Sequence, residues 1–175
     1  MHTASEIAMS VSTSLPTVRP RLVAHGGRYL SVLLLALLVT ACSGDLKRIT
    51  LNGQIAAADD LNPNYEGGAS PVVVRIYQLK TIGAFQSADF FSLLDNESSA
   101  IGEDLIAREE MELRPGETLD FKRDFSPRAN YIGVLAAFRD LENARWRAFA
   151  ALPRKSKVGV RIQLERLAVT VSVQP

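Results

Sequence analysis

Residues 70–80, with the sequence "SPVVVRIYQLK", show the pattern of a buried β-strand. Val72, Val74 and Ile76 are spaced two apart, so they fall on one face of an extended segment that is rich in β-branched residues. Pro71 stands at the entrance of the run, where its missing backbone donor removes no ladder hydrogen bond. The segment therefore predicts a strand, and similar runs recur on both sides of it.

Short alternating runs occupy most of the chain from residue 46 onward. We predict further strands within 46–57, 131–140 and 144–152, a hairpin within 108–125 around the Pro115-Gly116 turn, and an antiparallel pair within 158–173. The run at 131–140 is almost continuously apolar, which indicates a central strand. About eight short strands are typical of a β-sandwich, so we expect a mainly β domain over residues 46–175.

One section of this domain changes from a two-residue to a helical period. In residues 84–107, Phe90, Leu93 and Leu94 stand at i, i+3 and i+4, and either Ser87 or Asp89 can cap the helix. We predict a second short helix over 102–107, so that the two helices form an insertion between the second and third strands. The aromatic residues of the insertion are expected in the core rather than in a binding site: Phe85, Phe90 and Phe91.

Residues 1–41 have the features of a cleaved secretory signal peptide. Arg28 precedes an apolar run of about eleven residues, 29–39, which would span only about 16 Å and is too short for a hydrocarbon core of about 30 Å. A buried helix of the domain is the alternative, but the preceding segment is interrupted by proline and glycine and has no amphipathic period. We therefore expect residues 1–41 to be removed.

The end of this segment resembles the lipobox of bacterial lipoproteins. Val39, Thr40 and Ala41 precede Cys42, the only cysteine of the chain. The resemblance implies that the Cys42 sulfur carries a diacylglycerol and that its new amino terminus is acylated, with residues 42–45 as the tether. Ser43 rather than aspartate follows the cysteine, which by the same resemblance favours the outer membrane. Three acyl chains anchor a protein durably without a transmembrane helix.

The predicted cleavage also limits the chemistry of the mature chain. Both histidines, His2 and His25, precede Cys42, so the mature chain has neither a histidine nor a free thiol, which excludes His/Cys zinc sites and Ser-His-Asp or Cys-His catalysis. Adjacent acids are expected to be solvated rather than catalytic: Asp59-Asp60, Glu103-Asp104 and Glu109-Glu110. We therefore predict a binding protein, not an enzyme, with no cofactor beyond the lipid.

The charge balance does not indicate nucleic-acid binding. The chain has 20 basic and 19 acidic residues, a formal net charge of +1, and no basic face stands out in the sequence. The basic run "PRKSK" at 153–157 is interpreted as a loop in preference to a phospholipid-binding patch.

The segment "ADDLNPNYEGGAS", residues 58–70, is the strongest candidate for a functional surface. Its thirteen residues connect two predicted strands where a hairpin needs only about two to five, and long connections in compact domains are usually functional or disordered. The dipeptides Asn62-Pro63 and Gly67-Gly68 are expected to form turns that present four residues at the tip: Leu61, Asn64, Tyr65 and Glu66. We predict a partner-binding set there: Leu61, Asn62, Asn64, Tyr65 and Glu66. A solvated loop without a partner is the alternative.

The mature sequence resembles the TssJ (SciN) family of outer-membrane lipoproteins of bacterial type VI secretion. The resemblance covers about residues 46–151 and follows "VVVRIYQLK", "ADFFSLL", "GEDLIAREEMELRPGE" and "YIGVLAAFRD" in order. It implies a transthyretin-like β-sandwich with a helical insertion, tethered to outer-membrane lipid and facing the periplasm. It further implies that the protein holds the periplasmic C-terminal domain of the inner-membrane protein TssM, through the 58–70 loop, beside other subunits of the membrane complex.

Within this resemblance most of the motif residues have structural interpretations. Trp146 and Phe138 are expected in the core, and an ion pair is expected among Arg75, Arg139 and Asp140. Two other functions stay open: a lipoprotein carbohydrate- or ligand-binding module, which would need a concave aromatic-lined site, and a carboxylate-dependent hydrolase, which would need two convergent acids.

Overall fold

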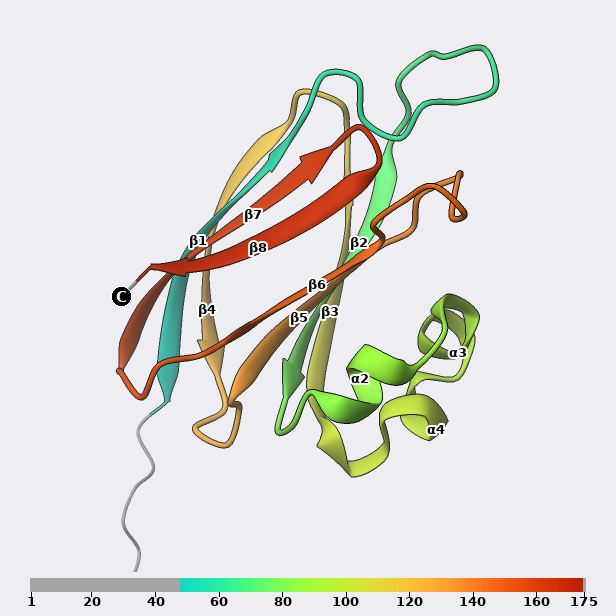
Figure 1. Ribbon diagram of the computed structural model, residues 1–175. Coiled ribbons are helices and arrows are strands. Elements are labelled where there is room, and N and C mark those ends of the chain that lie inside the picture. The colour runs from blue at the N-terminus through green and yellow to red at the C-terminus, as the bar shows by residue number, and fades with distance from the viewer. Residues whose placement is uncertain (1–47, 175) are drawn as a thin grey trace, which may run out of the picture. The chain divides into compact units, whose positions relative to one another are not determined.

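Two four-stranded sheets pack face to face in the computed structural model, which describes residues 48–174. The first sheet has the order β4-β1-β7-β8 and the second the order β3-β2-β5-β6 (Figure 1). The strand bounds are β1 Ile49–Ala57, β2 Val72–Leu79, β3 Leu105–Leu113, β4 Thr118–Phe125, β5 Tyr131–Ala136, β6 Arg147–Ala151, β7 Lys157–Glu165 and β8 Ala168–Gln174. The predicted mainly β sandwich with a helical insertion is confirmed.

β1 is an interior strand of the first sheet, between β4 and β7. It pairs antiparallel with β4 and parallel with β7, whereas β7 and β8 form the antiparallel pair predicted within 158–173. β5 lies between β2 and β6, which confirms the central position predicted for residues 131–140.

The core fills the space between the two sheets. Leu51 and Ile55 of β1 and Val74 of β2 have no exposed surface, as their spacing of two predicts. Burial of one such aliphatic side chain contributes about 1.5–3 kcal/mol, and this apolar layer defines which face of every strand points inward. Phe138 lies in the same core, and Trp146 packs against it while staying partly exposed.

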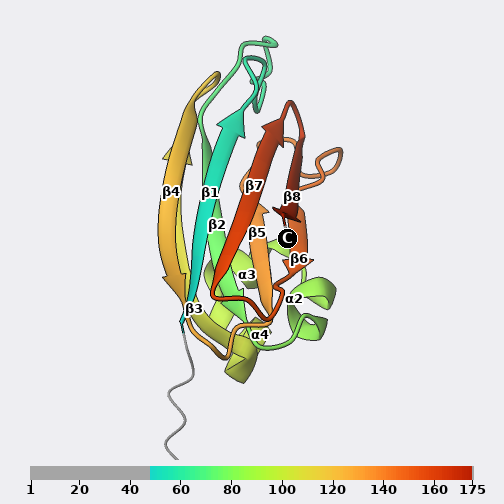
Figure 2. The same ribbon diagram turned by 90° about the vertical axis from the view of Figure 1, so that its left-hand side faces the viewer.

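The insertion between β2 and β3 covers part of the outer face of the second sheet. It contains α2 Gly83–Ser87, α3 Phe90–Asp95, α4 Glu97–Ile101 and a 3-10 turn, Gly102–Asp104. Figure 1 shows these helices outside the second sheet, while Figure 2 shows the first sheet without a helix over its outer face. Asp89 caps α3 by accepting a hydrogen bond from the Ser92 backbone N–H at 2.9 Å, so one of the two predicted caps is confirmed.

Two predictions for the insertion need correction. The helix predicted over 102–107 is present only as the 3-10 turn Gly102–Asp104, because β3 already begins at Leu105 and pairs there with Leu79 of β2. Phe85 and Phe90 are buried, as predicted, but Phe91 is 62% exposed. Phe90 is the buried ring of this neighbouring pair and packs edge-on against Trp146, with a centroid separation of 5.3 Å.

The predicted hairpin over 108–125 is also wrong, although its turn is present. The Glu117 N–H donates to the Arg114 carbonyl at 3.1 Å, and Gly116 has a φ of 73° at the third position, as in a type II turn. Type II turns splay the strands they connect, because their twist does not match a two-stranded hairpin. β3 accordingly pairs with β2 and β4 with β1, so the turn crosses from one sheet to the other.

The start of β1 and the β1–β2 loop lie at opposite ends of the sandwich. β1 begins at Ile49 at one end, and its nine residues span about 30 Å before the loop to β2 starts at the other end (Figure 1). Cys42 and the predicted signal peptide lie outside the described residues. Within residues 48–174 no helix combines the length and apolar character needed to cross a membrane.

Candidate partner-binding site

Four connections meet at the end of the sandwich where β1 finishes, which we call the loop end. They are the β1–β2 loop, 58–71; the β3–β4 turn, 114–117; the β5–β6 loop, 137–146; and the β7–β8 turn, 166–167. Backbone hydrogen bonds join the first two, since the Gly116 N–H donates to the Ala58 carbonyl at 3.2 Å. The predicted binding loop is therefore one part of a composite surface.

Asn62 links three of these connections. Its Nδ2 donates to the Pro71 carbonyl at 2.6 Å, and its Oδ1 accepts from the Arg139 backbone N–H at 2.8 Å. Its own backbone N–H donates to the Arg166 carbonyl at 2.9 Å. Asn62 is only 2% exposed and has a φ of 46°, a left-handed conformation that asparagine tolerates better than most residues.

The burial of Leu61 and Asn62 corrects the prediction that Leu61 lies at the loop tip and that both residues offer a surface to a partner. Leu61 has no exposed surface and belongs to the sandwich core, because the chain folds inward there before turning out again. In the sequence, the sign of this burial is a single leucine among polar loop residues. These two residues hold the loop and do not present a surface on it.

The outer part of the loop is an ordered turn built around Asn64. Its side-chain Oδ1 accepts from the backbone N–H of Glu66 at 3.0 Å and of Gly68 at 2.8 Å, while its backbone N–H donates to the Gly68 carbonyl at 2.8 Å. Gly67 closes the turn with a φ of 84°. This asparagine turn holds the tip in shape without burying it.

Tyr65 is presented at this tip and is fully exposed. Glu66 is exposed beside it, so two of the five predicted contact residues are at the surface and Asn64 is half-buried beneath them. An exposed tyrosine on a preordered turn combines a large apolar ring with a polar end and loses little conformational freedom when a partner binds. The geometry suits contact with a protein surface.

The loop end has exposed side chains of both charges. Asp59, Asp60 and Glu142 are exposed acids of the loop end, and Arg139 is an exposed base. Asp60 lies 3.7 Å from Arg166, both more than half exposed, so this pair contributes little to stability and stays available to a partner.

A hollow of about 540 Å³ lies elsewhere, on the outward face of the first sheet, and its polar lining does not fit a carbohydrate site. It is lined by Asn52, Gln54, Asp120, Lys122, Arg161 and Gln174, together with neighbouring residues of β1, β4 and β7. Sugar-binding sites usually offer aromatic faces within a concave pocket. The aromatic-lined space between β3 and β4, at Phe121 and Phe125, has only about 10 Å³ and does not admit a ligand.

Glu110, one of the acids considered for a hydrolytic pair, is engaged in ion pairs instead. Arg75 Nε contacts Glu110 at 2.6 Å, Arg108 contacts Glu110 at 2.9 Å and Glu97 at 3.0 Å, and Arg75 Nη1 donates to the Leu94 carbonyl at 2.7 Å. The hydrogen bond from Arg75 lowers the pKa of the Glu110 carboxyl from its ordinary value. This cluster attaches α3 and α4 to β2 and β3.

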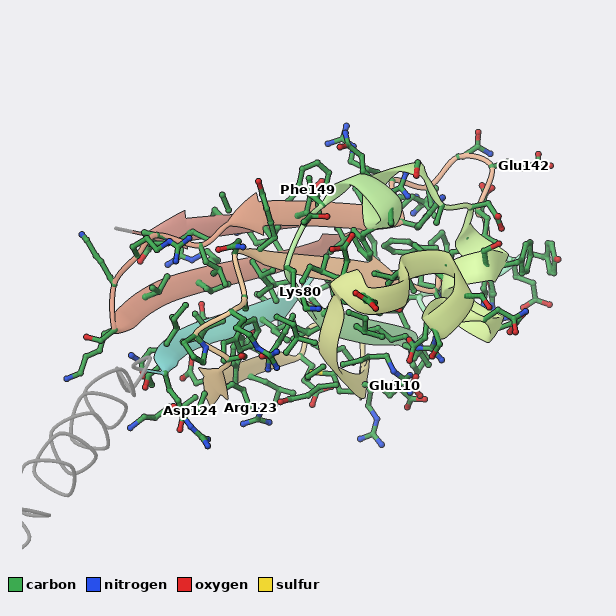
Figure 3. All side chains as sticks on the ribbon, turned by 90° about the horizontal axis from the view of Figure 1, so that it is seen from below. Lys80, Glu110, Arg123, Asp124, Glu142 and Phe149 are labelled. Atoms are coloured by element: carbon green, nitrogen blue, oxygen red, sulfur yellow. The ribbon has the colours of Figure 1, made fainter. Side chains whose placement is uncertain are left out.

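Glu109, adjacent to Glu110, points to a different partner. It pairs with Arg123 of β4 at 2.7 Å and so connects the edge strands of the two sheets. Figure 3 shows Glu110 beside the helical insertion and Arg123 next to Asp124 on β4. Within residues 48–174 no group of three or more His, Cys, Asp or Glu side chains is placed to hold a metal ion.

The predicted ion pair among Arg75, Arg139 and Asp140 is wrong. Arg75 pairs with acids of the insertion and β3, whereas Asp140 accepts hydrogen bonds from Asn143 within its own loop, at 2.9 and 3.1 Å from the side-chain amide. β2 and β5 are neighbouring strands, and the Ala137 N–H donates to the Val73 carbonyl at 2.8 Å, but the Arg75 and Asp140 side chains are engaged by different groups.

Comparisons with known proteins agree with this architecture. Residues 49–167 match the family model described as "Type VI secretion lipoprotein, VasD, EvfM, TssJ, VC_A0113". The crystal structure of the type VI lipoprotein TssJ1 from Pseudomonas aeruginosa is 35% identical with a TM-score of 0.70, over 73% of this chain and 98% of that one. The Serratia marcescens lipoprotein Lip, at 23% identity and a TM-score of 0.65 over 73% and 98%, shows the same fold. No curated protein sequence matches.

A further match is a chain from the solved structure of a complex. A chain of a "Type VI membrane complex" is 27% identical with a TM-score of 0.58, over 74% of this chain and 98% of that one. Fold and comparisons thus define a lipoprotein-type β-sandwich. The chain belongs to the type VI secretion lipoprotein family, whose members are structural components of the secretion system and not enzymes.

Proposed function

We propose that this protein anchors the periplasmic C-terminal domain of TssM to the outer membrane through the loop end of its sandwich. The direction of β1 carries the proposal. The tether from Cys42 enters the domain at Ile49, and β1 then separates that point from the start of the β1–β2 loop by about 30 Å. A lipid on Cys42 would therefore leave the loop end facing away from the membrane, toward a partner in the periplasm.

The comparisons support a partner of this kind. A similar chain occurs in a solved "Type VI membrane complex". Another, 29% identical with a TM-score of 0.55 over 72% of this chain and 98% of that one, occurs in the solved structure described as "T6SS protein TssM C-terminal domain (869-1107) from EAEC". Contact between a lipoprotein of this family and TssM would link the two membranes of the cell.

Binding of the unlipidated domain to the periplasmic domain of TssM from the same genome tests the partner. Tyr65→Ala removes the exposed ring without touching the asparagine turn, and we expect at least about a tenfold loss of affinity if the ring is an interface anchor. Phe91→Ala is the matched control, because Phe91 is also an exposed aromatic ring but lies on α3. Full affinity in Tyr65→Ala would contradict the role of the loop tip.

Fractionation of cells that express Cys42→Ser tests the anchor. We expect the variant to leave the outer-membrane fraction, to stay folded, and to bind TssM in solution while secretion is lost. Retention of the variant in the outer membrane would contradict lipidation at Cys42 as the anchor.

A further inference from the structure

Six basic side chains gather at the end of the sandwich opposite the loop end, which we call the basic end. Arg48 precedes β1, and the others lie in or beside three connections at the same end: Lys80, Arg128, Arg154, Lys155 and Lys157. All are exposed except Lys80, which is half-buried. They come from four separate parts of the sequence, so the run at 153–157 is only one part of the surface.

Backbone hydrogen bonds hold these segments together. The Thr50 N–H donates to the Ser156 carbonyl, and the Leu152 N–H donates to the Asn130 carbonyl, both at 2.8 Å. The Asn130 side-chain amide donates to the Lys80 carbonyl at 2.8 Å. Figure 3, which views the domain from this end, places Lys80 near the middle of it. The basic end is thus a fixed part of the fold.

The positive charges of the basic end are not neutralised within residues 48–174. None of the six side chains lies within ion-pair distance of a carboxylate there, whereas the domain's other arginines form several such pairs. The acids at this end are outnumbered by the six basic side chains: Asp124 accepts from the Thr50 hydroxyl at 2.9 Å, Asp104 accepts from the Thr81 hydroxyl at 2.7 Å, and Glu103 is exposed beside Asp104.

The tether leads to this end of the molecule. Six residue steps separate Cys42 from Arg48, and an extended chain spans at most about 3.6 Å per step, so the two α-carbons lie within about 22 Å of each other. A short tether of this kind gives the basic end a high effective concentration at any surface that holds Cys42. Electrostatic contact requires approach to within about 8 Å, the screening length at physiological salt.

We propose that the basic end is a docking surface for anionic phospholipid headgroups, so that the domain stands on the membrane with β1 upright and the loop end outward. The proposal rests on the proposed lipid anchor at Cys42 for its setting, but its chemistry is independent of the lipid. Each Lys or Arg near an anionic surface strengthens binding about fivefold, and six together suffice for weak, salt-sensitive docking that the anchor makes durable. Docking would fix the height and direction of the loop end.

Vesicle binding by the unlipidated domain, residues 43–175, tests the proposal. This unit contains both complete sheets, and the solved TssJ1 chain is covered almost entirely by the corresponding part, so the domain is expected to fold alone. We expect it to co-sediment with phosphatidylcholine vesicles that contain phosphatidylglycerol, and to be released by added salt. The triple variant Arg154→Glu, Lys155→Glu, Lys157→Glu reverses three charges and should bind at least about a hundredfold more weakly.

The matched control has the same change of charge on other faces. Arg114→Glu, Arg139→Glu and Arg161→Glu alter three exposed arginines away from the basic end and should leave vesicle binding close to that of the unchanged domain. Equal binding to pure phosphatidylcholine vesicles, or an equal loss in the control triple, would overturn the proposal. TssM binding and Cys42→Ser fractionation are measured separately, so failure of lipid docking is distinguishable from failure of the proposed function.

Discussion

The side-chain oxygen of Asn62 accepts a hydrogen bond from the Arg139 backbone N–H across 2.8 Å, although 77 positions separate the two residues. This contact joins the β1–β2 loop to the β5–β6 loop, which belongs to the second sheet. It explains how a long polar loop can have a defined shape at its base while its tip stays exposed. Asn62 is buried, so it holds the base of the loop end without forming part of the exposed surface.

Asn62→Ala should lower the free energy of unfolding by about 2–4 kcal/mol. The substitution leaves the Arg139 N–H and the Pro71 carbonyl without buried partners, and it places alanine at a φ of 46°. Urea unfolding measures the loss. Asn64→Ala is the control, because its two side-chain bonds lie at the exposed tip and should contribute less than about 1 kcal/mol. Equal losses in the two variants would contradict the distinction between the base and the tip.

Gly53→Ala should lower the free energy of unfolding by about 1–3 kcal/mol, because it disturbs the contact between β1 and the edge strand β4. A β-carbon at Gly53 would overlap the ring of Phe121, which lies directly across from it on β4 and covers the glycine. Thermal unfolding measures the effect. Gly83→Ala is the control, since nothing lies within 4 Å of its added β-carbon. In the Phe121→Ala background, Gly53→Ala should cause a clearly smaller loss of unfolding free energy. An unchanged loss would rule out the ring as the cause.

The ion pair between Arg75 and Glu110 should make the fold less stable in acid. Hydrogen bonding to Arg75 lowers the pKa of Glu110 below its ordinary value of 4.5, so the pair stabilises the fold above that pH and the contribution disappears as pH falls through the lowered pKa. Because the Glu110 side chain is 45% exposed, we expect Glu110→Gln to lose only about 0.5–1 kcal/mol near neutral pH. The difference from the unchanged protein should narrow below pH 4.5 in pH-dependent urea titrations. A difference that persists in acid would indicate packing instead of charge.

The strands were predictable because one face of each is buried and the side-chain period of a strand is two. Leu51 and Ile55 on β1 and Val74 on β2 show this directly, since all three are fully buried. The β3–β4 hairpin was mispredicted because alternation says where strands lie but not which strands pair. The Pro115-Gly116 turn carried the missing information, since its type II geometry separates its strands.

The candidate sites were predictable only where one segment contains them. Tyr65 stands out from the sequence as an aromatic residue in a long polar loop, and the structure exposes it fully. Asn62 does not stand out, because its role depends on a partner 77 positions away. The basic end was invisible for the same reason: residues such as Arg48, Arg128 and Lys155 meet only when the strands between them have paired.

Arg147→Met should loosen the helical insertion without disturbing the first sheet. Arg147 Nη1 donates to the carbonyls of Phe85 and Ala88, both at 2.7 Å, and these groups at the end of the short helix α2 would otherwise lack partners. The guanidinium also lies 4.6 Å from the Trp146 ring centre. We expect a loss of about 1–3 kcal/mol and faster hydrogen exchange in α2 and α3, but not in β7 or β8. Arg147→Lys keeps the charge but not the planar donor group, so its stability should lie between those of the unchanged protein and Arg147→Met. A uniform rise in hydrogen exchange across the domain would contradict a local role.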